Sequence, residues 1–275
     1  MIKAILKNAF AKQKPAYPYP SVSLFNWKPK DGTLNFGDEL SEVVTTLMLA
    51  SQGRTLLDEV REEKRLFTIG SILHFADNDA VVWGSGINGK IDPALHRFER
   101  LDVRAVRGPR TYERLKARGI SCPDVFGDPA LLLPSFCSPQ SAQALHDAIF
   151  IPNLNDLKAI SGLVMEPSIT LVSPLLSWNR VLQHIVSSKL VLSSSLHGVI
   201  LAESFGVPCR YVRISEVENM FKFLDYFEGT GRFDLEYATC LSEGLEMGGA
   251  NNLFYDATKL KEAFPFDIWE SRLEL

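Results

Sequence analysis

The feature that most constrains this 275-residue chain is a repeated alternation of short apolar runs with helical patterns. The runs RLFTIG (65–70) and AVVWGSG (80–86) end in glycine, and LVLSSS (190–195) ends in serines directly before a helical segment. Strands that alternate with helices pair in parallel, because each helix carries the chain back over the sheet. The alternation therefore predicts an α/β protein whose ligands bind beyond the carboxyl ends of parallel strands.

Apolar runs that predict strands occur in both halves of the chain. They span residues 21–27, 65–70, 80–86, 103–108 and 125–128, then 148–153, 169–174, 190–195 and 209–214. Helices are predicted over 38–53, 108–119, 154–161, 178–188 and 197–206. A Ser/Pro/Gln-rich stretch at 134–141 separates the two sets. We therefore expect an N-terminal α/β domain over 1–135 and a C-terminal α/β domain over 136–275, with the last helix returning to the N-terminal domain.

The charge balance and the cysteines argue against several function classes. The 29 basic and 33 acidic side chains give a net charge of −4, whereas nucleic-acid-binding proteins carry a basic excess. The four cysteines lie far apart without a CxxC pair, which is typical of a reducing compartment and of neither a zinc nor a thioredoxin-type site. Histidines and carboxylates show no metal-ligand spacing either. We therefore expect no metal site, and from the charge balance we expect no nucleic-acid partner.

The first 14 residues, MIKAILKNAFAKQK, place apolar residues at helical spacing between lysines. They lack the apolar core of a secretory signal, and no stretch of the chain approaches the ~18 apolar residues of a membrane span. A basic amphipathic helix binds the surface of anionic membranes. We therefore expect a cytoplasmic protein that is peripheral on the inner face of the plasma membrane; the alternative is a terminal helix that frays or packs on its own domain.

The sequence Asn35-Phe36-Gly37-Asp38 leads from the loop after the first strand into a helix. A carboxylate at a helix N-terminus accepts hydrogen bonds from free backbone N–H groups, so Asp38 is a candidate N-cap. It is equally a candidate for orienting or deprotonating a hydroxyl group. The two roles are compatible.

Two further strand ends carry residues suited to an anion. Glycines in Gly84-Ser85-Gly86 would let a ligand approach backbone N–H groups, although such a sequence is often only a turn. Arg107 ends the strand before a helix that begins at Pro109. Its planar guanidinium matches a carboxylate or phosphate with two hydrogen bonds, unless it is a solvated surface residue.

The strongest candidate site is the strand end at Ser193-Ser194-Ser195, which a helix follows at once. Hydroxyl groups, free N–H groups and the positive end of the helix converge there, as they do in anion sites. His197 lies in the first turn of that helix and is a candidate for accepting and donating protons. The other histidines, His74 among them, have no such setting.

Four sets of residues together resemble the polysaccharide pyruvyl transferase family, of the xanthan ketal pyruvate transferase type. They are NFGD (35–38), VVWGSGINGK (81–90), LDVRAVRGPRT (101–111) with GDPALL (127–132), and SSSLHGVILAESFGVP (193–208). The resemblance runs from about residue 24 to residue 270. Members transfer the pyruvyl unit of phosphoenolpyruvate to two hydroxyl groups of a sugar, forming a cyclic ketal and releasing phosphate.

The resemblance implies two Rossmann-like domains in an arrangement similar to the glycosyltransferase-B architecture, with the site in the interdomain cleft. It implies that the acceptor lies on the N-terminal side and the donor on the C-terminal side. The acceptor would be a lipid-linked oligosaccharide of an exopolysaccharide or capsule repeat unit. Phosphoenolpyruvate would be the co-substrate, and no cofactor would be required.

The same resemblance implies roles for particular residues. Arg107 and His197 match the family's donor-binding arginine and histidine, and Leu196 adjoins the histidine. From their places at strand ends we also expect Ser194, Ser195, Gly84, Ser85 and Gly86 to bind the donor, although many relatives have three consecutive glycines at 84–86. The acceptor would be bound by Asn35, Asp38 and Trp83, and catalysis would fall to His197 as the acid with Asp38 or Asp128 as the carboxylate. Many relatives have an arginine where this chain has Ser195, so the partner of the phosphate is left open among Arg104, Arg110 and Lys90.

Two other functions remain to be weighed against pyruvyl transfer. The segment HGVILAESFGVP (197–208) is also similar to the helix that glycosyltransferases of this architecture place beside a nucleotide-sugar diphosphate. A non-catalytic scaffold of a polysaccharide assembly complex would need neither Arg107 nor His197. Binding of phosphoenolpyruvate rather than nucleotide sugars is what separates the three hypotheses.

Overall fold

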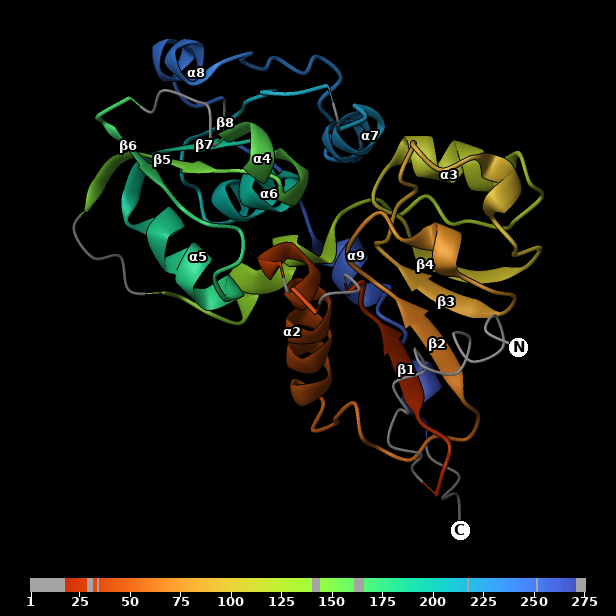
Figure 1. Ribbon diagram of the computed structural model, residues 1–275. Coiled ribbons are helices and arrows are strands. Elements are labelled where there is room, and N and C mark those ends of the chain that lie inside the picture. The colour runs from red at the N-terminus through yellow and green to blue at the C-terminus, as the bar shows by residue number, and fades with distance from the viewer. Residues whose placement is uncertain are drawn as a thin grey trace, which may run out of the picture.

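The computed structural model contains two four-stranded sheets, and every strand pairing in both is parallel (Figure 1). It describes residues 18–28, 32–33, 35–139, 144–160, 166–216, 218–250 and 252–270. The prediction of an α/β protein built on two parallel sheets is thereby confirmed. The predicted N-terminal amphipathic helix (1–14) lies outside the described residues.

The first sheet has the strand order β1-β2-β3-β4. Its strands are β1 (Val22–Phe25), β2 (Lys64–Phe67), β3 (Ala80–Trp83) and β4 (Leu101–Ala105). Helix α2 (Phe36–Ala50) joins β1 to β2, the short 3₁₀ turns η1 (Leu73–Phe75) and η2 (Pro93–Leu95) join the next strands, and α3 (Pro109–Lys116) follows β4.

The second sheet has the strand order β6-β5-β7-β8. Its strands are β5 (His146–Ile151), β6 (Ile169–Leu171), β7 (Ser188–Ser193) and β8 (Cys209–Tyr211). The connections contain η4 (Leu154–Asp156), α4 (Leu157–Ile160), α5 (Trp178–Val186) and α6 (Leu196–Ser204). The chain adds β6 on one side of β5 and then returns to add β7 on the other side, so the order in which strands are added reverses between β5 and β7. Such a switch point is where parallel sheets bind ligands.

The structure corrects two of the predicted elements and adds two helices. Residues 125–128 form no strand but a single bridge, Val106 to Phe126, before the 3₁₀ segment η3 (Pro129–Ser135). Helix α2 begins at Phe36 with Asn35 as its N-cap, because the Asn35 side chain accepts from the Gly37 N–H; Asp38 is therefore not the cap. The C-terminal part contains two helices that the sequence did not indicate, α7 (Phe221–Gly229) and α8 (Leu241–Met247), besides α9 (Thr258–Glu262) and η5 (Phe266–Trp269).

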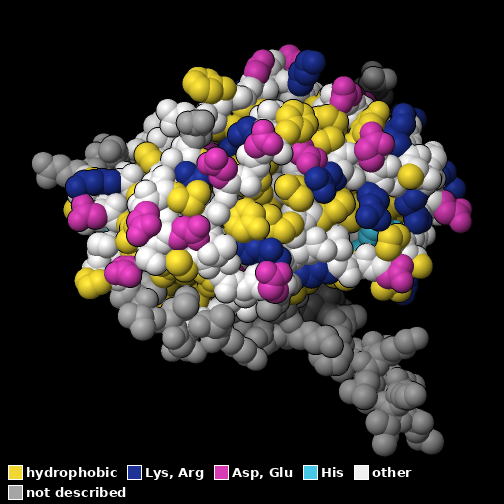
Figure 2. Space-filling view, turned by 90° about the horizontal axis from the view of Figure 1, so that it is seen from above, with side chains coloured by type: hydrophobic (Ala, Val, Ile, Leu, Met, Phe, Trp, Pro, Cys, Tyr) yellow, Lys and Arg dark blue, Asp and Glu magenta, His cyan; other side chains and the backbone are white. Residues whose placement is uncertain are grey.

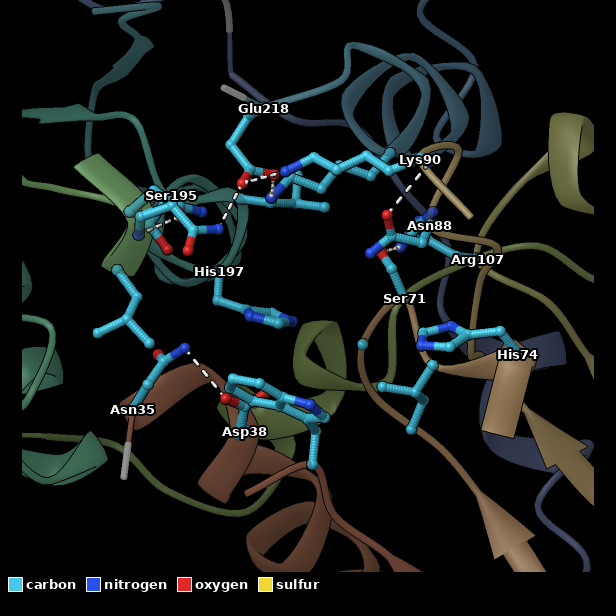
Figure 3. A pocket seen from close by; sticks show the side chains of 18 of the residues that line it. Asn35, Asp38, Ser71, His74, Asn88, Lys90, Arg107, Ser195, His197 and Glu218 are labelled. Carbon is cyan, nitrogen blue, oxygen red and sulfur yellow. Dashed lines mark hydrogen bonds and ion pairs between the residues drawn. The ribbon is translucent and has the colours of Figure 1, made fainter. Parts of the chain in front are cut away.

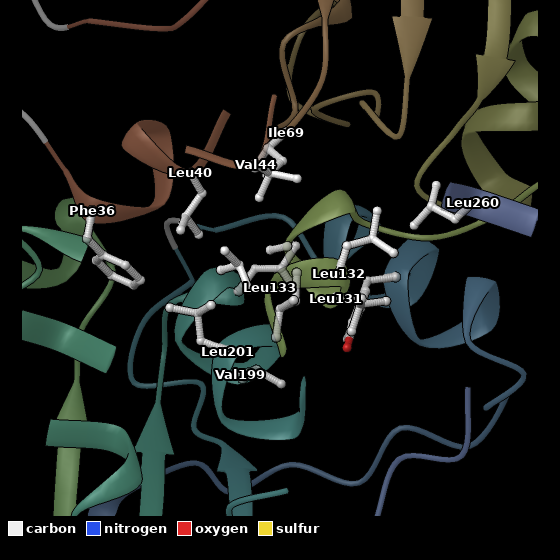
Figure 4. Close-up of a cluster of buried hydrophobic side chains, with 14 of the residues drawn as sticks. Phe36, Leu40, Val44, Ile69, Leu131, Leu132, Leu133, Val199, Leu201 and Leu260 are labelled. Atoms are coloured by element: carbon white, nitrogen blue, oxygen red, sulfur yellow. The ribbon is translucent and has the colours of Figure 1, made fainter. Parts of the chain in front are cut away.

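One hydrophobic core runs from the first sheet to the second. Helix α2 presents Leu40, Val44 and Met48 on one face, as their spacing of four residues requires, and all three are buried. Figure 4 shows Leu40 and Val44 of α2 facing Leu133 of η3, with Leu201 of α6 alongside. The apolar segment η3 therefore packs between a helix of each half and joins the two halves through buried side chains.

Segments of the second half also return to the first sheet. The indole Nε1 of Trp83 in β3 donates to the carbonyl of Leu260 in α9 at 2.8 Å. Arg104 in β4 forms an ion pair with Asp267 at 2.7 Å. Helix α7 packs on α3, where Asp225 reaches Arg107.

The face seen in Figure 2 carries acidic and basic side chains interspersed with apolar ones. Among the described residues, no helix is both long enough and apolar enough to cross a membrane.

Candidate active site

A cavity of about 250 Å³ lies where loops of the two sheets face each other. Residues that follow strands of both sheets line it. Those of the first sheet are Trp27 after β1, Ser71 and His74 after β2, Asn88 and Lys90 after β3, and Arg107 after β4. Those of the second sheet are Asn153 and Asn155 after β5, and Ser195, Leu196 and His197 after β7. Figure 3 shows His197 and Ser195 across the cavity from Arg107, Ser71 and Asn88. The parallel topology accounts for this convergence, because it brings successive strand ends to one edge of each sheet.

His197 stands at the start of α6 and leans over the first turn of α2. A Cβ atom at position 37 would lie 2.2 Å from Nδ1 of His197, so only glycine leaves room for the ring. Nε2 of His197 lies 3.8 Å from Oδ2 of Asp128, too far for a hydrogen bond. Both atoms are buried, and neither has a hydrogen-bond partner in the described part of the chain. A movement of about 1 Å would bring the pair within the usual hydrogen-bond distance.

Burial governs the protonation of this pair. It lowers the pKa of His197 to about 3, and the positive charges of Lys222 and Arg107 act in the same direction. Burial raises the pKa of Asp128 to about 6, although the Ala130 N–H donates to its carboxylate at 3.0 Å. Without a ligand, His197 is therefore a neutral imidazole at pH 7.

Asp38 lines the cavity opposite His197, as Figure 3 shows. Burial raises its pKa to about 7, against the opposing effects of Lys222 and of the Asn35 side-chain amide, which donates to Asp38 at 3.1 Å. Asn35 therefore both caps α2 and holds the carboxyl group of Asp38. The result is a carboxyl group that exchanges its proton near neutral pH, the range in which acid–base catalysts are most effective.

Arg107 reaches the cavity, but its guanidinium is not free. It is 1% exposed and pairs with Asp225 of α7 at 3.0 Å, while Nη2 donates to the carbonyl of Ile87. Nη1 donates to the hydroxyl of Ser71 at 2.6 Å. A guanidinium carries five N–H donors, so the Nη1 edge, shared with Ser71, is the part available to a ligand. The open fork expected from the sequence is thus occupied mainly by Asp225.

The residues Gly84, Ser85 and Gly86, expected to bind the donor, do not line the cavity. They support Arg107: the Ser85 carbonyl accepts from the Arg107 N–H, and a Cβ atom at position 86 would lie 2.4 Å from the guanidinium carbon. Trp83, expected to bind the acceptor, is fully buried and bonded to Leu260, and is therefore a core residue. Strand β3 is covered on both faces, so an aromatic residue in it points into a core rather than into a site.

The serine-rich strand end divides between structure and cavity. Ser194 is buried; its hydroxyl donates to Asp156 at 2.7 Å and accepts from the Asn153 N–H at 2.9 Å, so it braces the ends of β5 and β7. Ser195, the N-cap of α6, lines the cavity together with Leu196 and His197. The first N–H groups of α6 have no partner within the helix, which leaves the positive helix end facing the cavity.

Of the three cations considered for the phosphate, only Lys90 lines the cavity. Arg104 is paired with Asp102 and Asp267, and Arg110 is paired with Glu228.

The structure also adds cavity residues that sequence reasoning missed. They are His74, Asn88, Asn153, Asn155, Glu218 and Lys222. Asn153 directly follows the apolar run of β5, so the strand-end rule could have indicated it. Lys222 lies in α7, which no sequence pattern predicted.

A second cavity, of about 500 Å³, adjoins the first along α2. Asp38 and Trp27 line both cavities. The second is lined further by Trp178 and by the acidic residues Glu39 and Glu42. Aromatic faces next to carboxylates are suited to a polar ligand with apolar faces, such as a saccharide.

Neither cavity contains a group of three His, Cys, Asp or Glu side chains placed to hold a metal ion, and none is found elsewhere among the described residues.

Comparisons with known proteins agree with the resemblance seen in the sequence. The succinoglycan biosynthesis protein ExoV of Rhizobium meliloti (strain 1021) is 27% identical over 215 residues, which cover 75% of this chain and 64% of that protein. The match thus spans less than two thirds of the relative's length. A functionally uncharacterised protein from Klebsiella pneumoniae has a similar fold, with a TM-score of 0.50 and 13% identity, over 80% of this chain and 93% of that one. The family model "Polysaccharide pyruvyl transferase" matches residues 35–216, which include the cavity-lining loops after β2, β3, β4, β5 and β7, and the chain belongs to that family.

Proposed function

We propose that this protein transfers the pyruvyl unit of phosphoenolpyruvate to two hydroxyl groups of a saccharide, forming a cyclic ketal and releasing phosphate. The observation that carries the proposal is the meeting of His197, Asp38 and a set of cations in one cavity of a pyruvyl transferase family member. The cations would bind the anionic donor without a metal ion or other cofactor. We further propose that the two sheets form Rossmann-like domains of the glycosyltransferase-B kind.

The donor's carboxylate would bind at the Nη1 edge of Arg107 and the hydroxyl of Ser71, which lie 2.6 Å apart. Asp225 fixes the guanidinium in this orientation, so the cationic edge is in place before the ligand arrives. The free N–H groups at the start of α6, beside Ser195, would donate hydrogen bonds to a second anionic oxygen.

The pKa of Asp38 is raised and that of His197 is lowered, and such a pair of groups supports a cycle of acid–base catalysis. The protonated carboxyl group of Asp38 would give its proton to the methylene carbon of the donor, while neutral His197 takes the proton of the first hydroxyl as its oxygen bonds to the adjacent carbon. His197 would then give that proton to the departing phosphate, and the Asp38 carboxylate would take the proton of the second hydroxyl. Both residues return to their starting states, and both hydroxyl protons are accounted for.

Asp128 would act on His197 rather than on the substrate. It is fully buried and does not line the cavity, but its Oδ2 faces Nε2 of His197. An Nε2–H directed at this carboxylate would leave Nδ1 as the proton-accepting atom, and the carboxylate would stabilise the imidazolium once formed. Asp128 is therefore proposed as a positioning residue.

The acceptor would enter from the second cavity, since Asp38 lines both cavities. We propose a saccharide of an exopolysaccharide or capsule repeat unit, carried on lipid, with one sugar ring between Trp27 and Trp178. A lipid-linked acceptor would be met at the cytoplasmic face of the membrane, where the four lysines of residues 1–14 would contact anionic headgroups. Residues 15–275 should then sediment less with anionic vesicles than the full chain does; equal sedimentation would remove this segment from the proposal.

The alternative to phosphoenolpyruvate as the donor is a nucleotide sugar. Thermal shift measurements with phosphoenolpyruvate and with a panel of nucleotide sugars test the choice. Stabilisation by phosphoenolpyruvate alone is expected, whereas stabilisation by a nucleotide sugar alone would identify a glycosyltransferase, and stabilisation by neither would favour a scaffold.

A further inference from the structure

Two lysines at the edge of the first cavity share a single carboxylate. Nζ of Lys90 lies 2.7 Å from Oε1 of Glu218, and Nζ of Lys222 lies 2.6 Å from Oε2 of the same side chain. The side-chain amide of Asn155 also donates to Oε1 of Glu218 at 2.7 Å. Two ammonium groups balanced by one carboxylate leave one positive charge uncompensated.

These three side chains are largely withdrawn from solvent. The side chains of Lys90, Lys222 and Glu218 are 33%, 13% and 7% exposed. An uncompensated charge at such a position has lost much of its hydration, so a ligand anion that replaces the lost water binds it strongly. Burial lowers the pKa of Lys222, and the like charges of Lys90 and Arg107 contribute in the same direction.

The lysine pair faces the proposed reacting groups. The charge of Lys222 is one cause of the lowered pKa of His197 and also opposes the rise in the pKa of Asp38, so its ammonium group acts on both sides of the cavity. Figure 3 shows Lys90 extending across the top of the cavity to Glu218, above His197 and opposite Asp38. Arg107 and Ser71 lie on a different wall.

The pair also joins the two halves of the molecule. Lys90 follows β3 of the first sheet, Asn155 follows β5 of the second, and Glu218 and Lys222 belong to the segment that begins α7. The Asn219 side chain donates to the Gly89 carbonyl at 3.1 Å, which holds the two loops together. The cation pair is therefore fixed by contacts between three segments and is not formed by flexible surface side chains.

We propose that Lys90 and Lys222, held by Glu218, are the groups that bind the phosphate of the ligand in this cavity. The inference rests on the proposed function for the identity of that ligand as phosphoenolpyruvate. Binding would place the phosphate at the lysine pair and the carboxylate at Arg107 and Ser71, on separate walls, with the reacting carbons between them. The phosphate would also lie near His197, the group proposed to protonate it as it departs.

Calorimetric titration of phosphoenolpyruvate and of inorganic phosphate, separately, into Lys222→Met and Lys90→Met tests the assignment. Each variant should bind both probes about 10- to 100-fold more weakly than the unsubstituted protein does, the range for a lost charge-assisted hydrogen bond. Lys189→Met is the matched control, because Lys189 is 65% exposed, pairs with Asp147 and lies in β7 away from the cavity. Lys90 is partly exposed, so Lys90→Met remains informative if Lys222→Met fails to fold.

The outcomes separate this inference from the proposed function. If both lysine variants keep the affinity of the unsubstituted protein for phosphate, the assignment is wrong whatever the donor is. It is equally wrong if the unsubstituted protein binds neither probe. Lysine-dependent binding of inorganic phosphate without any binding of phosphoenolpyruvate would keep the phosphate site and contradict the proposed donor.

Discussion

At the scale of single residues, the cavity is defined by two groups whose pKa values have moved in opposite directions. Burial holds the imidazole of His197 neutral and gives the carboxyl group of Asp38 a pKa of about 7. An acid whose pKa lies near pH 7 next to a neutral base is the arrangement that proton transfer in both directions requires. The sequence indicated His197 as the acid and Asp38 as a carboxylate that orients or deprotonates a hydroxyl group; it could not indicate the pKa shifts, because burial and the nearby Lys222 are not visible in it.

Replacing His197 separates proton transfer from binding. His197→Ala should lower turnover by at least roughly 10²-fold while the protein stays folded, since positioned acid–base groups contribute ~10²–10⁴-fold. His197→Gln should be equally impaired, because an amide can hydrogen-bond phosphate but cannot exchange a proton at neutral pH. His146→Gln is the matched control; His146 begins β5 and contacts His184. Near-normal turnover of His197→Ala would remove this loop from the active site.

The raised pKa of Asp38 predicts how the stability of the protein depends on pH. Its pKa is about 7 in the folded protein and near the ordinary 3.8 when unfolded, so the folded state holds the proton more tightly. The stability associated with that proton is complete below about pH 4 and is lost as the pH rises to about 7. Asp38→Asn should therefore raise the free energy of unfolding by on the order of 1–3 kcal/mol at about pH 8 and have little effect at about pH 4.

Urea denaturation at the two pH values measures this difference. Asp147→Asn serves as the control, because the ion pair of Asp147 with Lys189 lowers the pKa of that carboxyl and the substitution should not stabilise the protein at high pH. A gain from Asp38→Asn that is the same at both pH values would contradict the raised pKa.

At the scale of elements, the first turn of α2 shapes the site. Asn35 caps the helix, Gly37 leaves room for His197, and Asp38 faces the cavity. Three separate features of the site therefore depend on the first turn of this one helix. The sequence indicated this turn but placed its cap at Asp38, since Asn and Asp are comparable N-caps and the local pattern does not distinguish them.

Gly37→Ala tests whether the contact between α2 and α6 positions the histidine. Alanine favours a helix by about 1 kcal/mol over glycine, so helix α2 itself should persist. The added Cβ atom would displace the His197 ring, and turnover should fall by on the order of 10²-fold. In the control Gly244→Ala, in α8, the added atom would meet the side chains of Leu192 and Val212 at 3.1 and 3.2 Å, and activity should be retained. Full activity of Gly37→Ala would show that the ring position does not matter.

Strand-end reasoning indicated several residues that line the first cavity, for a physical reason. Residues after β2, β4 and β7, such as Ser71, Arg107 and His197, meet because parallel strands end at the same edge. The rule failed for Gly84–Gly86, where the loop after β3 turns beneath the guanidinium of Arg107. The rule could not indicate Lys222, because Lys222 lies in α7, and α7 packs on α3, which is far away in the sequence.

At the scale of the whole molecule, one core links both sheets and the C-terminal segment. Trp269 is buried, stacks on Phe264 at 5.7 Å between ring centroids, and lies in the same core as Trp83 and Leu260. The sequence marked two separate units, and hydrophobic patterning does not report which apolar face meets which. The continuity of the core is therefore a tertiary result that the alternation of strands and helices could not supply.

Truncating Trp269 should weaken the entire fold. Trp269→Ala should lower the free energy of unfolding by ~3–5 kcal/mol, as is usual for a buried aromatic residue. Phe254→Ala, at a side chain that is 91% exposed, should change it by less than about 0.5 kcal/mol. Urea denaturation should show one cooperative transition for both. Separate transitions of the two halves would contradict a shared core.

Pyruvyl transfer by this protein is tested by the mass of the acceptor after reaction. Purified protein is incubated with phosphoenolpyruvate and extracted lipid-linked oligosaccharide, and both the saccharide mass and the released phosphate are measured. We expect the saccharide to gain the mass of pyruvic acid less one water, one phosphate to be released per saccharide modified, and neither change with His197→Ala. An unchanged saccharide with phosphoenolpyruvate, together with a gain of one sugar residue when nucleotide sugars are supplied, would contradict pyruvyl transfer.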